Sequence, residues 1–422
     1  MDTDRENDRH EPQHWPDFMG AMEPEASESL VPAVAPADIA LVAPSNEVPA
    51  SISAWSGEWS GWAGQARRFD IKLIVERLSL HEATIVCVRA STSKGVFSER
   101  LLAEVHGNEL RGSLSNGASL WFRMRNPDAV ELLWRELDGA CIAGVLSQRI
   151  PNGHRITERV PTGMVEQGEQ ITLEMVTFKP PGGSGPFPTV VFNHGSTGFG
   201  NDPSLFTSTT TSPALAKYFN DRGWMVVFPQ RRGRGKSGGL YDEGFQPDWS
   251  GYSGDPRYAL PGVEHALRDV EWVIDHLLAR DDVDRDRLLI GGQSRGGFIA
   301  LGSAGERRGL FRGVINFVGG WVGDQGPASG LINRAIAVRG AAFPGPTLWL
   351  YAENDPFYTT AHSRGNFEAF VAAGGRGEFH LLETLPGQNG HLILPFSDLW
   401  GPIVDDLLKR VGERTSRSTW KR

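Results

Sequence analysis

The stretch from Arg287 to Glu306 places the tightest constraint on how this chain can fold. Leu288, Leu289 and Ile290 form a short apolar run that is typical of a buried strand. The residues after Gly297 are small and apolar, which favours a helix packed against a sheet. Between the two lies Gly292-Gln293-Ser294-Arg295-Gly296, the spacing of a sharp strand-to-helix turn that lifts one serine hydroxyl to the top of a sheet. The pattern predicts an α/β fold with Ser294 as a candidate nucleophile.

The same glycine-serine spacing occurs a second time, at Gly235-Lys236-Ser237-Gly238-Gly239. Because the chain contains 51 glycines in 422 residues, chance matches to this spacing are expected. The flanking sequence therefore has to show which copy is the strand-to-helix turn. A strand-like run precedes Ser237, but no helical period follows it, so this copy is predicted to be a turn. It also resembles the end of a phosphate-binding loop, yet position 230, where that motif requires glycine, is Gln230. Nucleotide binding is therefore not expected.

Charge is distributed unevenly along the chain, whose formal net charge is -9. The first fifty residues hold eleven acidic residues and two arginines, so they account for the whole excess, and the rest of the chain is balanced. No basic region is left to bind nucleic acid. The same fifty residues contain seven prolines and few aromatic residues, and we expect residues 1–50 to be a disordered acidic tail.

We expect no segment of this sequence to export or anchor the protein. The most apolar part of the tail, residues 30–48, is interrupted by three prolines and lacks a preceding basic region, which argues against a signal peptide or a membrane span. Cys87 and Cys141 both lie in strand-like runs, which suggests two buried thiols in a reducing compartment. We therefore expect a cytoplasmic protein.

Residues 54–149 have the pattern of an antiparallel β domain. After a tryptophan-rich start, apolar and polar residues alternate in short runs that are separated by turns such as Gly107-Asn108 and Asn116-Gly117. Seven or eight such strands can close into a small barrel or pack as a sandwich. We expect a structural or docking module, with ligand binding as the alternative.

From residue 155 to residue 415 the pattern changes to strands that alternate with helical segments. Such alternation predicts a mostly parallel sheet flanked by helices. The clearest helical segment is residues 258–278, where apolar residues recur at intervals of three and four. We therefore expect a second, α/β domain over residues 155–415.

A serine nucleophile needs a base and an acid that orients the base. Of the downstream histidines, His391 is the preferred base because it lies in a glycine-rich loop after the last strand. His362 falls in a predicted helix and His380 in a predicted strand. Asp355 is the preferred acid because its loop follows the apolar strand of residues 348–351, and Asp324 and Glu353 are the reserves. The order Ser294, Asp355, His391 is the one expected of a G-x-S-x-G hydrolase.

The negative charge that develops during acyl transfer needs preformed donors. The segment Phe192-Asn193-His194-Gly195-Ser196 ends the first buried strand of the α/β domain. We assign the oxyanion hole to the backbone N–H groups of Ser196 and Arg295. For His194 we expect a structural role.

On these motifs, together with the Arg-Gly-x-Gly-x-Ser turn at residues 232–237, residues 160–412 resemble the α/β-hydrolase superfamily, in particular its dienelactone-hydrolase and prolyl-oligopeptidase-like branches. The chain departs from these relatives at Gln230, where aspartate is frequent, and at Ser294, where dienelactone hydrolases proper have cysteine. The resemblance implies a serine hydrolase that cleaves small carboxylic esters through an acyl-enzyme.

The resemblance implies no cofactor, metal, nucleic-acid or membrane partner, and it leaves the oligomeric state open. The alternatives are a peptidase of the prolyl-oligopeptidase-like type and a non-catalytic ligand-binding protein. The peptidase is disfavoured because residues 54–149 are too few to form the large propeller of those relatives.

Overall fold

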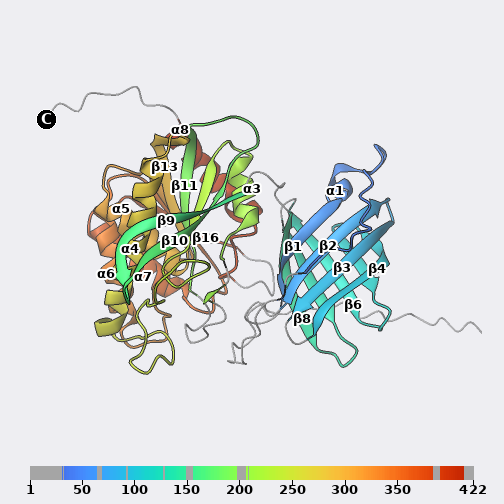
Figure 1. Cartoon of the computed structure of the whole chain (residues 1–422), viewed down its shortest axis with the longest axis horizontal. Helices are drawn as coiled ribbons and strands as arrows, with labels where there is room; N and C mark the ends of the chain where they lie inside the picture. The colour runs from blue at the N-terminus through green and yellow to red at the C-terminus, as the bar shows by residue number, and fades with distance from the viewer. Residues whose placement is uncertain are drawn as a thin grey trace, which may run out of the picture.

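The computed structural model describes residues 31, 33–63, 69–91, 94–126, 129–148, 155–196, 206–207, 209–383 and 390–412. It contains a closed β-barrel and, beside it, a β-sheet covered by helices (Figure 1). The part of the predicted disordered tail that covers residues 1–30 lies outside the described residues. The boundaries at residues 149 and 155 remain predictions.

The barrel is an up-and-down antiparallel meander. Each strand pairs with the next one along the chain, and β1 also pairs with β8, which makes the structure a barrel rather than a sandwich. Alternate residues point inward, so that Leu120, Phe122 and Trp134 are fully buried in its interior. Its strands are β1 (Gly57–Ala63), β2 (Phe69–Leu78), β3 (Glu82–Ser91), β4 (Gly95–His106), β5 (Glu109–Ser113), β6 (Ser119–Asn126), β7 (Ala129–Arg135) and β8 (Cys141–Gln148).

Residues 33–50 correct the expectation that the chain is disordered up to residue 50. Ala33 packs against the outer face of β2 and β3, and its N–H donates to Oδ2 of Asp70 at 2.7 Å. Further along, Arg100 pairs with both Asp38 and Glu76. The segment has no apolar period of its own, but the barrel offers it an apolar strip and two carboxylates as partners. A short helix, α1 (Ala50–Ser53), then leads into β1.

The prediction of two buried thiols is correct for Cys87 and wrong for Cys141. Cys87 points into the barrel, where burial raises the pKa of its thiol to about 12. Cys141 is exposed because it begins β8, next to the turn at Gly139. Alternation along a strand does not reveal which end residues the barrel covers.

The second part of the chain is an α/β domain built on one eight-stranded sheet. Its sheet has the order β16-β15-β14-β13-β11-β12-β10-β9. Among the described residues, β11 to β16 make five parallel pairings, and the hairpin of β9 and β10 adds two antiparallel ones. The strands are β9 (Arg155–Glu166), β10 (Glu169–Phe178), β11 (Phe187–Asn193), β12 (Met225–Pro229), β13 (Val283–Gln293), β14 (Gly313–Phe317), β15 (Thr347–Ala352) and β16 (Gly377–Leu382).

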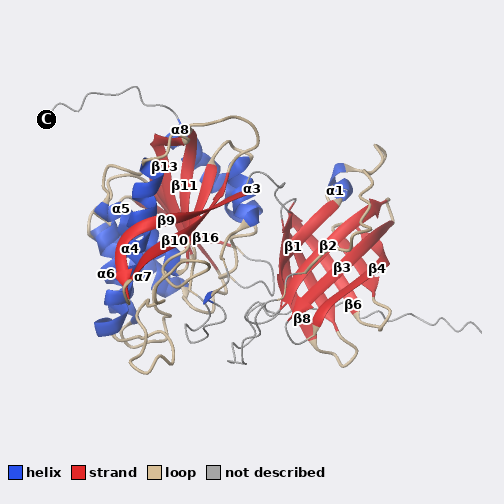
Figure 2. Ribbon diagram, viewed as in Figure 1, coloured by secondary structure: helices blue, strands red, loops and turns tan. Residues whose placement is uncertain are grey.

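Helices cover both faces of this sheet (Figure 2). α3 (Pro213–Asn220) packs with α8 (Ser397–Gly412), and the hydroxyl of Tyr218 joins them by donating to the carbonyl of Gly401 at 2.8 Å. The other group comprises α4 (Pro256–Leu278), α5 (Arg295–Glu306), α6 (Ser329–Gly340) and α7 (Thr360–Ala372). Over the described ranges, we find no helix with the length and apolar character needed to span a membrane.

The barrel contacts the α/β part through β6 and β8, which touch α8 and α3. β7 lies between them and is buried on both sides: its outward-facing Glu131 and Leu133 are only 1% and 2% exposed. Glu131 is paired with Arg123 and Arg125, and the Arg125 guanidinium stacks on the ring of Phe396, 4.9 Å from its centroid. This face of the barrel therefore carries a buried ion-pair cluster next to the segment that leads into α8.

Candidate active site

Ser294 lies at a sharp turn between β13 and α5, as its sequence context predicts. Its φ of 57° and ψ of -124° place a non-glycine residue in a strained conformation. Only glycine fits at position 296, because a Cβ there would lie 2.0 Å from the carbonyl oxygen of Asn193. The hydroxyl group is held where β13 ends, and the residue is 7% exposed.

Asp355 and His391 meet although they come from different loops. Oδ2 of Asp355 lies 2.9 Å from Nδ1 of His391, and the two side chains are 1% and 10% exposed. The loops can approach because position 390 is glycine: a Cβ there would lie 1.9 Å from the carbonyl oxygen of Glu353. The carbonyl of His391 also accepts a hydrogen bond from Nε2 of Gln293, the residue before Ser294. The structure thus brings the His391 loop to the turn that carries Ser294.

The other oxygen of Asp355 orders its own loop. Oδ1 accepts hydrogen bonds from the N–H groups of Phe357 at 2.8 Å and Tyr358 at 3.1 Å. The carboxylate is therefore fixed from both sides, with one oxygen facing the backbone and one facing His391. This is the arrangement that holds an imidazole in a single orientation.

Asp324, the reserve acid, has a different set of partners. Its Oδ2 accepts from the N–H of Thr359, the N-cap of α7, at 2.7 Å, and its Oδ1 accepts from Gln325 at 2.9 Å. Burial alone would raise the pKa of Asp324, but these hydrogen bonds outweigh it and hold the pKa below the usual value. The structure gives Asp324 a position at the start of α7.

The remaining reserve residues are also placed away from these roles. Nε2 of His362 lies 2.8 Å from Nδ2 of Asn333, and burial lowers the pKa of His362. His380 lies on the edge strand β16 beside Glu378. Glu353 is exposed.

The loop after β11 passes directly over Ser294. A Cβ on Gly195 would lie 3.2 Å from Cβ of Ser294, so the backbone that leads to Ser196 is in contact with the turn. His194 is buried, and Arg231 donates to the carbonyl of His194 at 2.9 Å and to that of Gly195 at 3.2 Å. Fixed carbonyls also fix the amides that follow them, which is what a preformed oxyanion hole requires.

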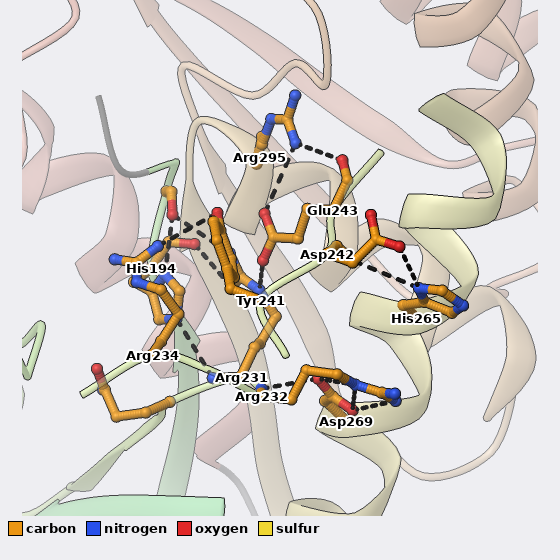
Figure 3. A network of polar contacts seen from close by, with 12 residues as sticks. His194, Arg231, Arg232, Arg234, Tyr241, Asp242, Glu243, His265, Asp269 and Arg295 are labelled. Carbon is orange, nitrogen blue, oxygen red and sulfur yellow. Dashed lines mark hydrogen bonds and ion pairs between the residues drawn. The ribbon is translucent and has the colours of Figure 1, made fainter. Parts of the chain in front are cut away.

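A buried charge network underlies this loop and was not anticipated from the sequence (Figure 3). Arg231 and Glu243 form an ion pair in which both side chains are no more than 3% exposed. Desolvation would raise the pKa of Glu243, but Arg231 and Arg295 overcome this and the pKa is lowered. Nothing in the spacing of residues 231 and 243 marks them as partners, because the pairing depends on how the loop between β12 and α4 folds back.

The side chain of Arg295 belongs to the same network. Its Nη1 donates to the carbonyl of Glu243 at 2.8 Å, and its guanidinium lies 3.5 Å from the centroid of Tyr252 and 4.3 Å from that of Trp321. Arg295 is 3% exposed. The residue that supplies an amide next to Ser294 therefore also anchors the start of α5 to the loop between β12 and α4.

The second serine, Ser237, has a structural position. Its hydroxyl donates to the carbonyl of Gln230 at 2.7 Å and accepts from the N–H of Glu174 at 2.8 Å. These bonds join the turn after β12 to β10. The prediction that this copy of the pattern is a turn agrees with these contacts.

Comparison with known proteins gives one family and a set of distant structures. The family described as serine aminopeptidase, S33, matches residues 206–368. No curated protein matches.

Similar solved structures include a putative dienelactone hydrolase from Klebsiella pneumoniae subsp. pneumoniae MGH 78578, with 19% identity, a TM-score of 0.40, and coverage of 60% of this chain and 99% of that one. Est1E from Butyrivibrio proteoclasticus, bound to ferulic acid, has 14% identity, a TM-score of 0.42, and coverage of 61% and 100%. An acetyl xylan esterase from Paenibacillus sp. R4 has 15% identity, a TM-score of 0.42, and coverage of 69% and 88%.

Proposed function

We propose that the part of this chain from β9 to α8 is an α/β-hydrolase, and that the protein is a serine hydrolase that cleaves carboxylic esters through an acyl-enzyme. The family match over residues 206–368 supports this proposal. The proposed nucleophile is Ser294, the base is His391, and the acid that orients the base is Asp355. The observation that carries the proposal is the 2.9 Å contact between Nδ1 of His391 and Oδ2 of Asp355, in a loop bonded to the strained Ser294 turn.

The proposed reaction begins with proton transfer from Ser294 to Nε2 of His391. The freed electron pair on Oγ forms a bond to the ester carbonyl carbon, and the carbonyl π electrons move onto oxygen. The N–H groups of Ser196 and Arg295 stabilise that oxyanion. When the intermediate collapses, the C–O bond to the alcohol breaks and His391 returns its proton to the leaving alkoxide. Water then repeats the sequence on the acyl-enzyme, and Oγ leaves.

Asp355 keeps one imidazole tautomer throughout. By accepting from Nδ1–H, it leaves Nε2 free to take the serine proton, and it stabilises the imidazolium that forms. Every proton in this scheme moves between substrate, water, Ser294 and His391. The proposal also retains a small ester as substrate, a cytoplasmic location, and no nucleic-acid, membrane, metal or cofactor partner.

A peptidase is the second candidate, favoured by the description of the family that matches residues 206–368. Peptide bonds and esters share the acyl-enzyme route, so the residues above would serve both. A panel of p-nitrophenyl esters of increasing acyl length, measured beside aminoacyl p-nitroanilides, separates them. Turnover of the anilides at rates equal to or above those of the esters would establish the peptidase.

The direct test is covalent labelling with a fluorophosphonate. We expect the wild-type protein to be labelled at Ser294, and Ser294→Ala to lose both label and ester turnover, with kcat lower by roughly 10⁴- to 10⁶-fold. Ser237→Ala is the matched control: it removes a serine from the same G-x-S-x-G spacing, and it should keep turnover while its melting temperature falls. If the wild-type protein is not labelled, a non-catalytic binding protein is supported instead. If both variants lose turnover equally, the assignment of Ser294 as the nucleophile is wrong.

A further inference from the structure

Two aromatic rings that pack against the imidazole of His391 differ in their exposure. The ring centroid of Phe357 lies 4.7 Å from that of His391 at an interplanar angle of 60°, and the centroid of Tyr358 lies 5.7 Å from it. Tyr358 is 5% exposed, and the tip of its ring rests on Gly320, where a Cβ would lie 2.3 Å from Cζ. Phe357 is partly exposed. Of these two rings, Phe357 is therefore the one that a bound molecule can reach.

Hydrogen bonds on both sides of Phe357 fix its backbone. Its N–H donates to Oδ1 of Asp355 at 2.8 Å, and the other oxygen of that carboxylate lies 2.9 Å from Nδ1 of His391. Its carbonyl accepts from the N–H of Asp324 at 2.9 Å. Asp324 in turn is bonded to the N–H of Thr359 at the start of α7. The phenyl ring therefore has a fixed place beside the imidazole before any substrate binds.

The chemistry of the proposed reaction decides which part of an ester meets this ring. In acylation, Oγ of Ser294 bonds to the carbonyl carbon, and the carbonyl oxygen points to the N–H groups of Ser196 and Arg295. The ester oxygen has to lie within hydrogen-bond reach of Nε2 of His391, because it takes that proton as the C–O bond breaks and keeps the bonding electron pair. The substituent on the ester oxygen thus extends from the imidazole and away from the oxyanion hole.

We propose that Phe357 is a specificity-determining residue that contacts the alcohol side of the ester and favours alcohols that carry an aromatic ring. This inference rests on the proposed function. Aromatic rings in offset or edge-to-face contact are stabilised beyond the effect of the apolar area that they bury, because the edge of one ring is positive and the face of the other is negative. An aliphatic ring of the same size gains only from burial. The residue that selects the alcohol thus lies next to the residue that protonates it.

Phe357→Leu tests the contact because it removes the aromatic ring and keeps an apolar side chain. The substrates are the benzyl and cyclohexylmethyl esters of one acid, whose acyl group is the one turned over fastest in the p-nitrophenyl panel. The two alcohols have similar size and acidity, and both esters give the same acyl-enzyme. We expect the wild-type protein to have the higher kcat/KM for the benzyl ester, and the benzyl-to-cyclohexylmethyl ratio of kcat/KM to fall about 2- to 10-fold in the variant.

This ratio separates selection of the alcohol from a structural role of Phe357. A displaced imidazole would lower kcat/KM for both esters equally and leave the ratio unchanged. Each ratio is taken within one sample, so incomplete folding does not affect it. Phe357→Trp keeps an aromatic ring beside His391, and it should keep the wild-type ratio to within about twofold.

Phe367→Leu is the matched control. Phe367 is also partly exposed, and it lies in α7, where its ring centroid is 5.4 Å from that of Trp349. A Cβ on Gly377, the first residue of β16, would lie 3.2 Å from Cε2 of Phe367. This ring therefore lies where the parallel strands begin, whereas Ser294 follows the end of β13. We expect a lower melting temperature with the ratio unchanged.

Four results would overturn the inference. The first is an unchanged ratio in Phe357→Leu, and the second is an equal fall in Phe367→Leu. The third is a loss in Phe357→Leu that depends on acyl length across the p-nitrophenyl panel, because the ring would then line the acyl side. The fourth is a wild-type protein that hydrolyses neither of the two esters. In each case, fluorophosphonate labelling of wild-type Ser294 shows that the proposed function survives, whereas failure of that function leaves Ser294 unlabelled.

Discussion

Replacing Asp355 by asparagine tests the proposed base and acid together, because the two side chains have nearly the same shape. The asparagine oxygen can still accept from the N–H groups of Phe357 and Tyr358, as Oδ1 of Asp355 does at 2.8 and 3.1 Å. The amide nitrogen then replaces Oδ2 at 2.9 Å from Nδ1 of His391. Because that nitrogen is a donor, His391 has to accept at Nδ1 and carry its proton on Nε2. In that tautomer it cannot take the proton of Ser294.

The expected loss in kcat is about 10⁴-fold, which corresponds to roughly 5.4 kcal/mol of transition-state stabilisation. Stability should change far less, because the backbone bonds survive and a charge with 1% exposure is removed from the interior. The assay is steady-state ester hydrolysis with circular dichroism melts of the same samples. Asp324→Asn is the matched control, and it should keep kcat within a few-fold because its partners are Thr359 and Gln325. A large loss in Asp324→Asn with little in Asp355→Asn would refute the reasoning.

Two other predictions follow from contacts outside the proposed triad. Arg295→Ala should lower the free energy of unfolding by about 3–5 kcal/mol, because Glu243 loses one of its two arginine partners in the interior and a cavity opens beside Trp321; denaturant titration measures this, and an unchanged free energy of unfolding would contradict it. Removal of residues 1–30 should leave the melting temperature unchanged, whereas removal of residues 1–50 should lower it, because the second deletion uncovers the barrel face that Val31 and Ala33 cover. Equal melting temperatures for the two truncations would show that these contacts add nothing to stability.

Local sequence determines the parts of this protein that depend on chain geometry over a few residues. The Ser294 turn was predictable because a strand, a strained serine and a helix within twenty residues leave few side chains that fit at positions 292 and 296. The β-barrel was predictable as a meander because each strand pairs with its sequence neighbour. The preference for Asp355 and His391 relied on chain order after known strands, and the 2.9 Å contact agrees with it.

Local pattern was insufficient where an element depends on what covers it. Sequence patterns did not predict β9, whose residues 155–166 alternate weakly, or α6, whose twelve residues include two glycines and four polar residues. Residues 33–50 were predicted to be disordered, because their composition cannot form a core alone. In each case tertiary packing supplies partners that the segment lacks, such as β10 for β9 and the outer face of the barrel for Ala33.

Tertiary structure alone decided which polar groups meet. The Glu243 carboxylate pairs with Arg231 and contacts Arg295 across sequence separations that carry no periodic signal. Such contacts depend on side-chain rotamers and on loops that fold over the ends of the sheet. A shift of a few ångströms in such a loop would break a bonded pair and expose both groups to water. The amino-acid sequence by itself therefore determined the turn that presents Ser294, and only the folded loops determined which side chains surround it.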